Sequence, residues 1–228
     1  MTSLSVIVPW GRPPGVVGEQ RQRVWDYLRP RWEALGHELV VADDPEVGRG
    51  WSTARALHAG MAQATGDVIV SYGADHLPDP DVVNAAVALL GEHPWCFLYR
   101  DVAYATEAST AALIDGAITE AQLQWSHYSG RCVGMWGWRR STWDTVGGVD
   151  PRFVGWGYGD DAFNDVLETV FGPSPAPPGD VLRELWHTGT DRDASAANPN
   201  HGLYFTEYAP HRGNRQHMLA MQQKWSAT

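Results

Sequence analysis

The first part of the chain repeats one pattern three times: a short apolar run is followed by a segment whose apolar residues recur at helical spacing. The three apolar runs are 5–9 (SVIVP), 38–42 (ELVVA) and 67–72 (DVIVSY). Helical spacing follows at 17–35, from Ser52 to Gly66, and again around 83–90. Parallel strands need long crossover connections, which are usually helices. We therefore expect an α/β fold with a mostly parallel sheet flanked by helices.

The rest of the chain predicts shorter elements within the same domain, 1–228. We expect strands at 96–100, 131–138 and 183–187, an alanine-rich excursion at 104–125, and a C-terminal helix with Met218, Leu219, Met221 and Trp225. The polar, turn-rich segment 188–202 is typical of a mobile flap. Pro30 lies within the first helical segment, which it should kink or split.

Composition excludes several classes of protein. The formal net charge is −10 and Lys224 is the only lysine, so a nucleic-acid partner is disfavoured. No apolar run approaches the ~20 residues of a membrane span. Without a recognisable signal peptide, the sequence favours a cytoplasmic protein. In that compartment Cys96 and Cys132 are expected to be free thiols, with a disulfide as the alternative.

Polar residues gather where the predicted strands end. Arg12, Asp43, Asp44, Asp75 and His76 all follow an apolar run directly or within its loop. Ligands of open α/β sheets bind beyond the carboxyl ends of the strands. In so acidic a chain, an anionic ligand must be held by selected arginines, helix N-termini or a metal ion.

A second cluster of unusual residues lies at 147–170, GGVDPRFVGWGYGDDAFNDVLETV. Asp160 and Asp161 fall at the start of a predicted helix. One explanation is that they cap this helix and stabilise the positive end of its dipole. The glycine-rich lead-in around Trp156, however, allows close backbone approach and supplies a flat apolar surface. This combination favours a sugar site that contains a general base.

Taken in order, these segments resemble the GT-A-fold glycosyltransferases. SVIVP, VVADDP and WSTARALHAGMAQATGDVIVSYGADH are similar to glycosyltransferase family 2. GGVDPRFVGWGYGDD, with His187 after it, is similar to the C-terminal block of β-1,4-galactosyltransferases and polypeptide N-acetylgalactosaminyltransferases. The resemblance runs from about Ser5 to His187 and leaves 104–129 and the tail without counterparts.

The resemblance implies transfer of a hexosyl or N-acetylhexosaminyl group from a nucleotide-sugar donor to a glycan, protein or small-molecule acceptor. It also implies a divalent cation, Mn²⁺ or alternatively Mg²⁺, because the leaving diphosphate develops negative charge. Asp75 matches the family's metal-binding carboxylate and His187 its later histidine ligand, with His76 as a further candidate. Gly73 stands where the family usually has the first Asp of its motif.

The donor half, about 1–101, carries the residues that the resemblance assigns to the nucleotide. Asp43 and Asp44 match the acidic pair that meets the base and ribose; the alternative is a plain Asp-Pro turn. Arg55 matches a basic position near the donor and is otherwise a solvated helix residue. The remaining candidates are Pro9 and Arg12 after the first strand and Arg192 in the flap (188–228 with the C-terminal helix).

The second half, about 102–190, is expected to bind the acceptor. In inverting relatives the block reads Gly-Trp-Gly-x-Glu-Asp and its Asp is the base. Here Gly159 replaces the Glu, so Asp160 becomes the base when the motifs are aligned, and Asp161 when they are shifted by one. Candidates for contact with the sugar are Trp156 first, then Trp136, Trp138 and Gly157.

Two other functions stay open. Gly73 and Gly159, each replacing a family carboxylate, are also compatible with a non-catalytic sugar- or nucleotide-binding protein. A sugar-phosphate nucleotidylyltransferase needs a catalytic lysine near the N-terminus, and Lys224 lies in the tail. The favoured hypothesis requires Asp75 and His187 to hold a cation with Asp160 facing it across a cleft.

Overall fold

The computed structural model describes residues 3–130, 134–189 and 195–226. A five-stranded sheet with the order β2-β1-β3-β7-β4 lies at the centre. Its strands are β1 (Leu4–Pro9), β2 (Glu38–Ala42), β3 (Val68–Ser71), β4 (Trp95–Phe97) and β7 (Trp136–Arg139). β1 pairs in parallel with β2 and β3, whereas β7 runs antiparallel to β3 and β4. The α/β class with a mostly parallel sheet is therefore confirmed: β2, β1, β3 and β4 run in one direction, and β7 alone among the described strands of this sheet runs against them.

A second sheet of three strands has the order β6-β5-β8. It contains β5 (Tyr99–Ala105), β6 (Trp125–Gly130) and β8 (Gly179–Glu184), with β5 antiparallel to β6 and parallel to β8. An isolated antiparallel bridge joins His76, in the loop after β3, to Glu184 at the end of β8. This bridge brings the ends of the two sheets together.

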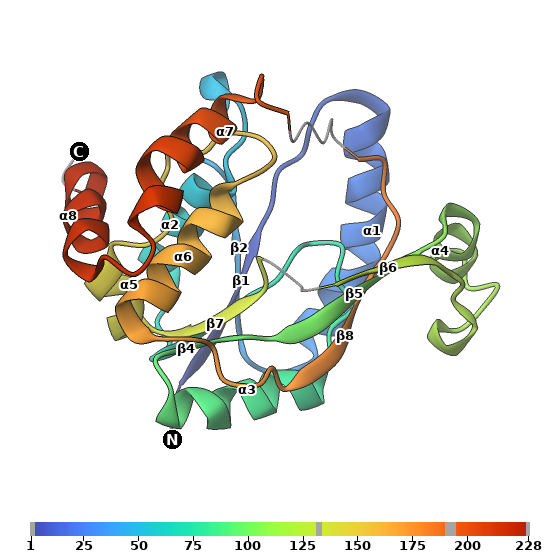
Figure 1. Ribbon diagram of the computed structural model, residues 1–228. Helices are drawn as coiled ribbons and strands as arrows, with labels where there is room; N and C mark the ends of the chain where they lie inside the picture. Colours follow the sequence, from blue (N-terminus) through green and yellow to red (C-terminus); the bar gives the residue numbers. More distant parts are fainter. Residues whose placement is uncertain (1–2, 131–133, 190–194, 227–228) are drawn as a thin grey trace.

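Helices cover both faces of the central sheet (Figure 1). One face packs on α1 (Gly15–Glu33) and α3 (Pro80–Glu92), and the other on α2 (Thr53–Gln63), α5 (Arg140–Val146), α6 (Gly159–Phe171) and α8 (Arg215–Ser226). Side chains alternate along β1 accordingly: Val6 and Val8 join the first core and Ile7 the second. Each strand of the parallel core is thus apolar on both sides.

Short elements complete the fold. The excursion between β5 and β6 contains α4 (Glu107–Ile114) and a 3₁₀ turn, Glu120–Gln122; another 3₁₀ turn, Val47–Arg49, precedes α2. Figure 1 shows α4 at the side of the molecule that carries α1, and Arg23 of α1 pairs with Asp115. α7 (Pro199–Leu203), a π-helical turn (Tyr204–Tyr208) and a 3₁₀ turn (Ala209–His211) lead into α8.

Two local predictions need correction. Pro30 does not split α1, which runs on to Glu33, although proline removes one hydrogen bond from the helix. Of the segment predicted as one strand at 131–138, the described residues 134–138 form a strand from Trp136 onward. Residues 131–133, Cys132 among them, lie outside the described residues. Cys96 is a buried free thiol, as predicted. In the described part of the chain, no helix has both the length and the apolar character needed to span a membrane.

Candidate functional site

Asp75 and His187 meet at the carboxyl edge of the central sheet. The N–H of Leu77 donates to the carbonyl of Arg183, and the N–H of Leu185 donates to the carbonyl of Asp75. These two bonds align the loop after β3 with the end of β8. As a result Nε2 of His187 lies 2.8 Å from Oδ2 of Asp75, so two residues 112 positions apart in the chain form one contact.

Glu184 completes this cluster, and sequence reasoning missed it. Ligand atoms of Asp75, Glu184 and His187 all lie within 4.8 Å of one another, and His187 Nε2 is 3.8 Å from Glu184 Oε1. Two carboxylates and one imidazole are donors that suit a divalent cation such as Mn²⁺. The spacing Glu-x-x-His in RELWH was the available signal.

The imidazole of His187 is oriented by a second contact. Its Nδ1 lies 2.9 Å from the carbonyl oxygen of Thr188, which can only accept, so Nδ1 carries a proton and Nε2 faces Asp75. Burial lowers the pKa of His187, but the hydrogen bond and charge of Asp75 outweigh burial and raise it. Burial likewise would raise the pKa of Asp75, yet the adjacent imidazole of His76 and the hydrogen bond and charge of His187 hold it well below its usual range.

His76 plays a different part from the one predicted. Its Nδ1 accepts from the N–H of Gly73 at 2.8 Å, which leaves Nε2 facing Asp75 Oδ1 at 3.3 Å and Glu184 Oε2 at 3.5 Å. It does not belong to the group of three whose ligand atoms converge. We therefore interpret His76 as a buried partner of the two carboxylates and not as a metal ligand.

Gly73 is a spatial requirement of this arrangement. A Cβ atom at this position would lie 2.5 Å from Oδ1 of Asp75 and 2.7 Å from Cε1 of His76. Any side chain there would therefore displace the residues that surround the cluster. The close packing leaves no room for an Asp at this position.

Asp160 lies in the first turn of α6. The carboxyl Oδ2 is 3.0 Å from the place where a Cβ of Gly134 would be. Gly134 lies two residues before the first residue of β7. Because β7 runs antiparallel to β3, the start of β7 lies beside the end of β3, which Asp75 follows. Asp160 therefore lies at the same edge of the sheet as Asp75. Asp160 is exposed, yet the protein atoms around its carboxyl group displace part of its hydration. This desolvation, and after it the negative charge of Asp161, raises the pKa of Asp160 to about 6.

The loop before α6 is held by an asparagine that the sequence did not single out. Nδ2 of Asn200 donates to the carbonyls of Val154, Trp156 and Gly157 at 2.9, 3.3 and 3.1 Å. The side chain of Asn198 donates to the carbonyl of Trp156 as well, at 3.0 Å. With its backbone fixed in this way, the loop keeps the Trp156 side chain 42% exposed, which is the state that a sugar platform requires.

Tyr158 connects this loop to α6 with a left-handed backbone, φ 62°, unusual for a residue with a side chain. Its ring stacks on Tyr204 at 5.5 Å and meets the edge of His201 at 5.4 Å. Strained backbone of this kind persists only where packing enforces it. Here the aromatic contacts fix the direction in which the chain enters α6, and with it the position of Asp160.

The predicted acidic pair after β2 divides into two environments. Asp43 is exposed, and its Oδ1 accepts the adjacent backbone N–H of Asp44 at 2.8 Å. Asp44 is buried and accepts Nε and Nη2 of Arg55 at 2.8 and 2.6 Å and the N–H of Ser52 at 2.8 Å. The prediction that Asp44 and Arg55 both contact the nucleotide is corrected accordingly: they pair with each other, which leaves Asp43 as the accessible acid.

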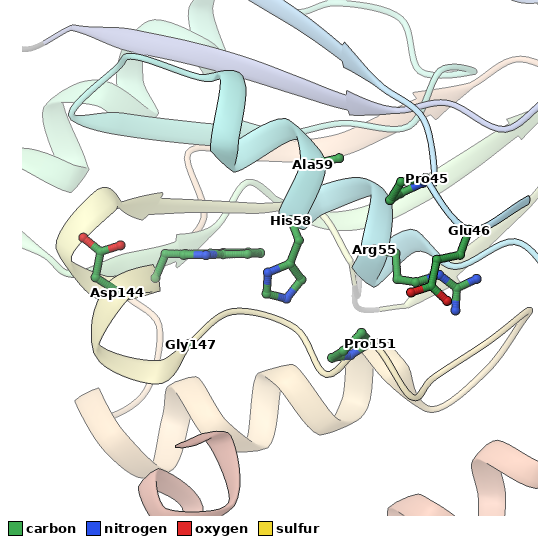
Figure 2. Close-up of a pocket in the computed structure, with 9 residues that line it drawn as sticks. Pro45, Glu46, Arg55, His58, Ala59, Asp144, Gly147 and Pro151 are labelled. Carbon is green, nitrogen blue, oxygen red and sulfur yellow. The ribbon is translucent and has the colours of Figure 1, made fainter. Parts of the chain in front are cut away.

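Arg55 also borders a separate cavity of about 530 Å³ (Figure 2). The cavity lies between α2, the loop after β2 and the turn between α5 and α6; its lining comprises Pro45, Glu46, Arg55, His58, Ala59, Trp143, Asp144, Gly147 and Pro151. His58 donates to the carbonyl of Val149 at 2.8 Å and so ties α2 to that turn. None of the cation-binding candidates lines this cavity.

The other predicted site residues differ in accessibility. Pro9 ends β1, and Arg12 is exposed in the loop that follows. Trp136 and Trp138 are 1% and 0% exposed and pack on Phe163, so they are core residues and offer no surface to a sugar. Arg192 lies outside the described residues.

Comparison with known proteins gives a limited result. No family model matches the chain, and no curated protein matches it. Among solved structures, a mutant Drosophila β-1,4-galactosyltransferase 7 with manganese, UDP-Gal and xylobiose is similar, at 20% identity and a TM-score of 0.41. That similarity covers 72% of this chain and 59% of the galactosyltransferase.

Glucosyl-3-phosphoglycerate synthase from Mycobacterium tuberculosis, in complex with Mn²⁺ and UDP-glucose, is similar at 18% identity and a TM-score of 0.44. The similarity covers 85% of this chain and 73% of the synthase. Likeness of this extent does not establish an activity, so the function of this chain must be inferred from its own residues.

Proposed function

We propose that this protein is a metal-dependent glycosyltransferase of GT-A type that moves a sugar from a nucleotide-sugar donor to an acceptor hydroxyl. The observation that carries the proposal is the convergence of Asp75, Glu184 and His187 at the sheet edge where Asp160 also lies. A cation site and a carboxylate with a raised pKa, placed at one ligand-binding edge, are the two components that such a transfer needs.

The three residues of the cluster fit a hard divalent cation. Their donor atoms already converge, and the Nδ1 contact of His187 with Thr188 leaves Nε2 directed at the cluster. The contact between His187 and Asp75 must open to admit the ion, with loss of the proton between them. When bound, the cation would neutralise the negative charge that develops on the leaving diphosphate.

Asp160 is proposed to act as the base. Its carboxylate takes the proton of the acceptor hydroxyl as the hydroxyl oxygen bonds to the anomeric carbon. The bond from that carbon to the diphosphate oxygen breaks with its electron pair on the leaving group. A single displacement of this kind inverts the anomeric configuration. A pKa of about 6 keeps Asp160 mostly ionised at neutral pH while making it a stronger base than an ordinary aspartate.

The remaining exposed candidates suit the two substrates. Asp43 and Arg12 follow the carboxyl ends of β2 and β1, where a nucleoside would lie beside the cation. Trp156, four residues before Asp160, offers an exposed indole, and the apolar C–H face of a pyranose stacks on such rings. We assign the nucleoside of the donor to the edge formed by the ends of β1 and β2, and the sugar to the loop that carries Trp156.

A thermal-shift screen of nucleotide sugars with and without Mn²⁺ tests the proposal. Ligands that bind the native state raise the melting temperature by mass action. We expect at least one nucleotide sugar to raise it in the presence of Mn²⁺ and to have little effect after chelation. Release of nucleoside diphosphate from that donor then separates an enzyme from a non-catalytic binding protein. If no nucleotide sugar shifts the melting temperature, the proposal is wrong.

A further inference from the structure

Arg21, on the second turn of α1, has an unusual environment. It lines a narrow cleft together with Trp10, Val24, Ala74, Asp75 and His187. The side chain is half-buried, and within the described chain it has no hydrogen-bond or ion-pair partner. Other arginines of α1, by contrast, are paired: Arg23 with Asp115 at 2.9 Å, and Arg29 with Glu33 at 2.8 Å. The N–H donors of Arg21 are therefore available to an anionic ligand that binds beside this cluster.

The backbone around Arg21 is fixed against the cation-binding candidates. The neighbouring Gln20 accepts a hydrogen bond from the hydroxyl of Thr188, the residue that also orients His187. Val24, Trp25 and Leu28 anchor the same helix in the core. Arg21 therefore keeps its place beside the cluster and acts electrostatically on both Asp75 and His187.

A cation held by Asp75, Glu184 and His187 would repel Arg21, because both are positive. The two positive groups become mutually compatible when one anion bridges them. A diphosphate has oxygens enough to bind a divalent cation and a guanidinium at once, and arginine is well suited to phosphate oxygens.

We propose that Arg21 binds the diphosphate of the donor, on the side opposite the cation, and so helps to hold the leaving group. This inference rests on the proposed function and adds to it a positioning residue that the sequence did not indicate. It also implies that the diphosphate and the cation bind cooperatively, since each screens the repulsion that the other would meet.

Isothermal titration with Mn²⁺ alone, and with inorganic pyrophosphate in the presence of Mg²⁺, tests the proposal. Arg21→Ala should weaken pyrophosphate binding by about tenfold or more, as expected for a lost charge-assisted hydrogen bond. The same variant should bind Mn²⁺ alone as tightly as the wild type or more tightly, since a repulsive charge is gone. Arg21→Lys should recover part of the pyrophosphate affinity, and the control Arg23→Ala should change neither ligand.

The outcomes separate the two proposals. If the wild type binds both ligands and Arg21→Ala binds pyrophosphate equally well, Arg21 is wrongly assigned and the proposed function stands. Parallel loss of Mn²⁺ and pyrophosphate binding, with a lowered melting temperature, would mean a structural role and would also overturn the assignment. If the wild type binds neither ligand, the proposed cation site itself is wrong, and the role of Arg21 falls with it.

Discussion

Arg55 and Asp44 form a two-point ion pair in which Nε lies 2.8 Å from Oδ1 and Nη2 lies 2.6 Å from Oδ2. Both side chains are buried, and Asp44 also accepts the backbone N–H groups of Glu46 and Ser52. Ser52 in turn donates to the carbonyl of Phe153 at 2.7 Å. The pair thus fixes the loop after β2 against the loop that leads to Trp156.

Removing one member of this pair should strongly destabilise the protein. Arg55→Ala would leave Asp44 buried without its cation, and we expect a loss of about 3–5 kcal/mol in the free energy of unfolding. Arg49→Ala is the matched control, since the pair of Arg49 with Glu46 is exposed and should contribute at most about 1 kcal/mol. Urea unfolding of both variants measures the difference. Equal losses in the two variants would show that the buried pair has no special role.

The same pair should influence acid stability. Burial alone would raise the pKa of Asp44, but hydrogen bonds from Arg55 and two backbone N–H groups hold it below its model-peptide value of 3.8. The stabilisation is therefore complete above that pH and is lost as the pH falls through the lower pKa of the folded state. Unfolding free energies measured from pH 5 downward should fall more steeply for the wild type than for Asp44→Asn.

Asp160 should control the acid limb of the pH–rate profile. Because its pKa is raised to about 6, kcat/KM should increase as the pH rises through about 6 and then level off. Asp161→Asn removes a negative neighbour and should shift this limb to lower pH. Asp160→Asn should lower kcat by about 10²–10⁴-fold, the usual contribution of a general base. Steady-state rates between pH 4 and 9 check all three.

The ionisation of Asp160 should lower the stability of the folded protein as the pH rises, whereas it raises kcat/KM. The pKa of Asp160 is about 6 in the folded protein and 3.8 ordinarily, so ionisation is harder in the folded state. The free energy of unfolding should therefore fall as the pH rises from 3.8 to about 6. Asp160→Asn should therefore raise the melting temperature above pH 6, although it lowers kcat. If Asp160→Asn is inactive and also less stable than the wild type, Asp160 has a structural role. If Asp160→Asn turns over as fast as the wild type, the base is Asp161.

Gly73 should be essential for the cation site although it provides no ligand. Gly73→Ala places a Cβ 2.5 Å from Asp75 Oδ1, so we expect Mn²⁺ affinity to fall by about 10–100-fold, as when outer contacts of metal ligands are lost. Gly73→Asp, which restores the family's usual residue, should be no better. The control is Gly91→Ala in α3, where a Cβ meets nothing within 4 Å. Tighter Mn²⁺ binding by Gly73→Asp would contradict this account.

Asn200 should act on the acceptor side of the reaction. Asn200→Ala removes the donor shared by the carbonyls of Val154, Trp156 and Gly157 and should cost about 1–3 kcal/mol of unfolding free energy. Because the loop around Trp156 loses its support, the acceptor KM should rise more than kcat falls, and amide exchange at 154–157 should accelerate. The exposed Asn84→Ala serves as control. Unchanged exchange at 154–157 would disprove the proposed support.

The sequence was most informative where chain order alone decides the geometry. Strand–helix alternation predicted the parallel pairs of β1 with β2 and β3, and the carboxyl ends of these strands necessarily share one edge. That edge contains Asp43 and Asp75, as expected. The meeting of Asp75 with His187 was predicted through family resemblance and is found as a direct contact. Glu184 escaped notice because the Glu-x-x-His spacing in RELWH was not considered, and burial of a carboxylate on a short strand cannot be read from the sequence.

Predictions that depended on which face is covered were less successful. Trp136 and Trp138 lie on the same face of β7, and the sequence did not show that α5 and α6 cover that face. Likewise, two adjacent aspartates after β2 look equivalent until the first turn of α2 folds back and brings Arg55 to one of them. Burial depends on tertiary packing, which neither residue type nor spacing determines.

The central claim is that Asp75, Glu184 and His187 bind the cation of a sugar-transfer site. Crystals grown with Mn²⁺ and UDP, and measured at the manganese absorption edge, test it most directly. The account predicts an anomalous peak within roughly 2.0–2.6 Å of a carboxylate oxygen of Asp75 and of Glu184 and of Nε2 of His187, as for hard divalent cations. A structure in which His187 still contacts Asp75 and manganese is absent or bound elsewhere would contradict it.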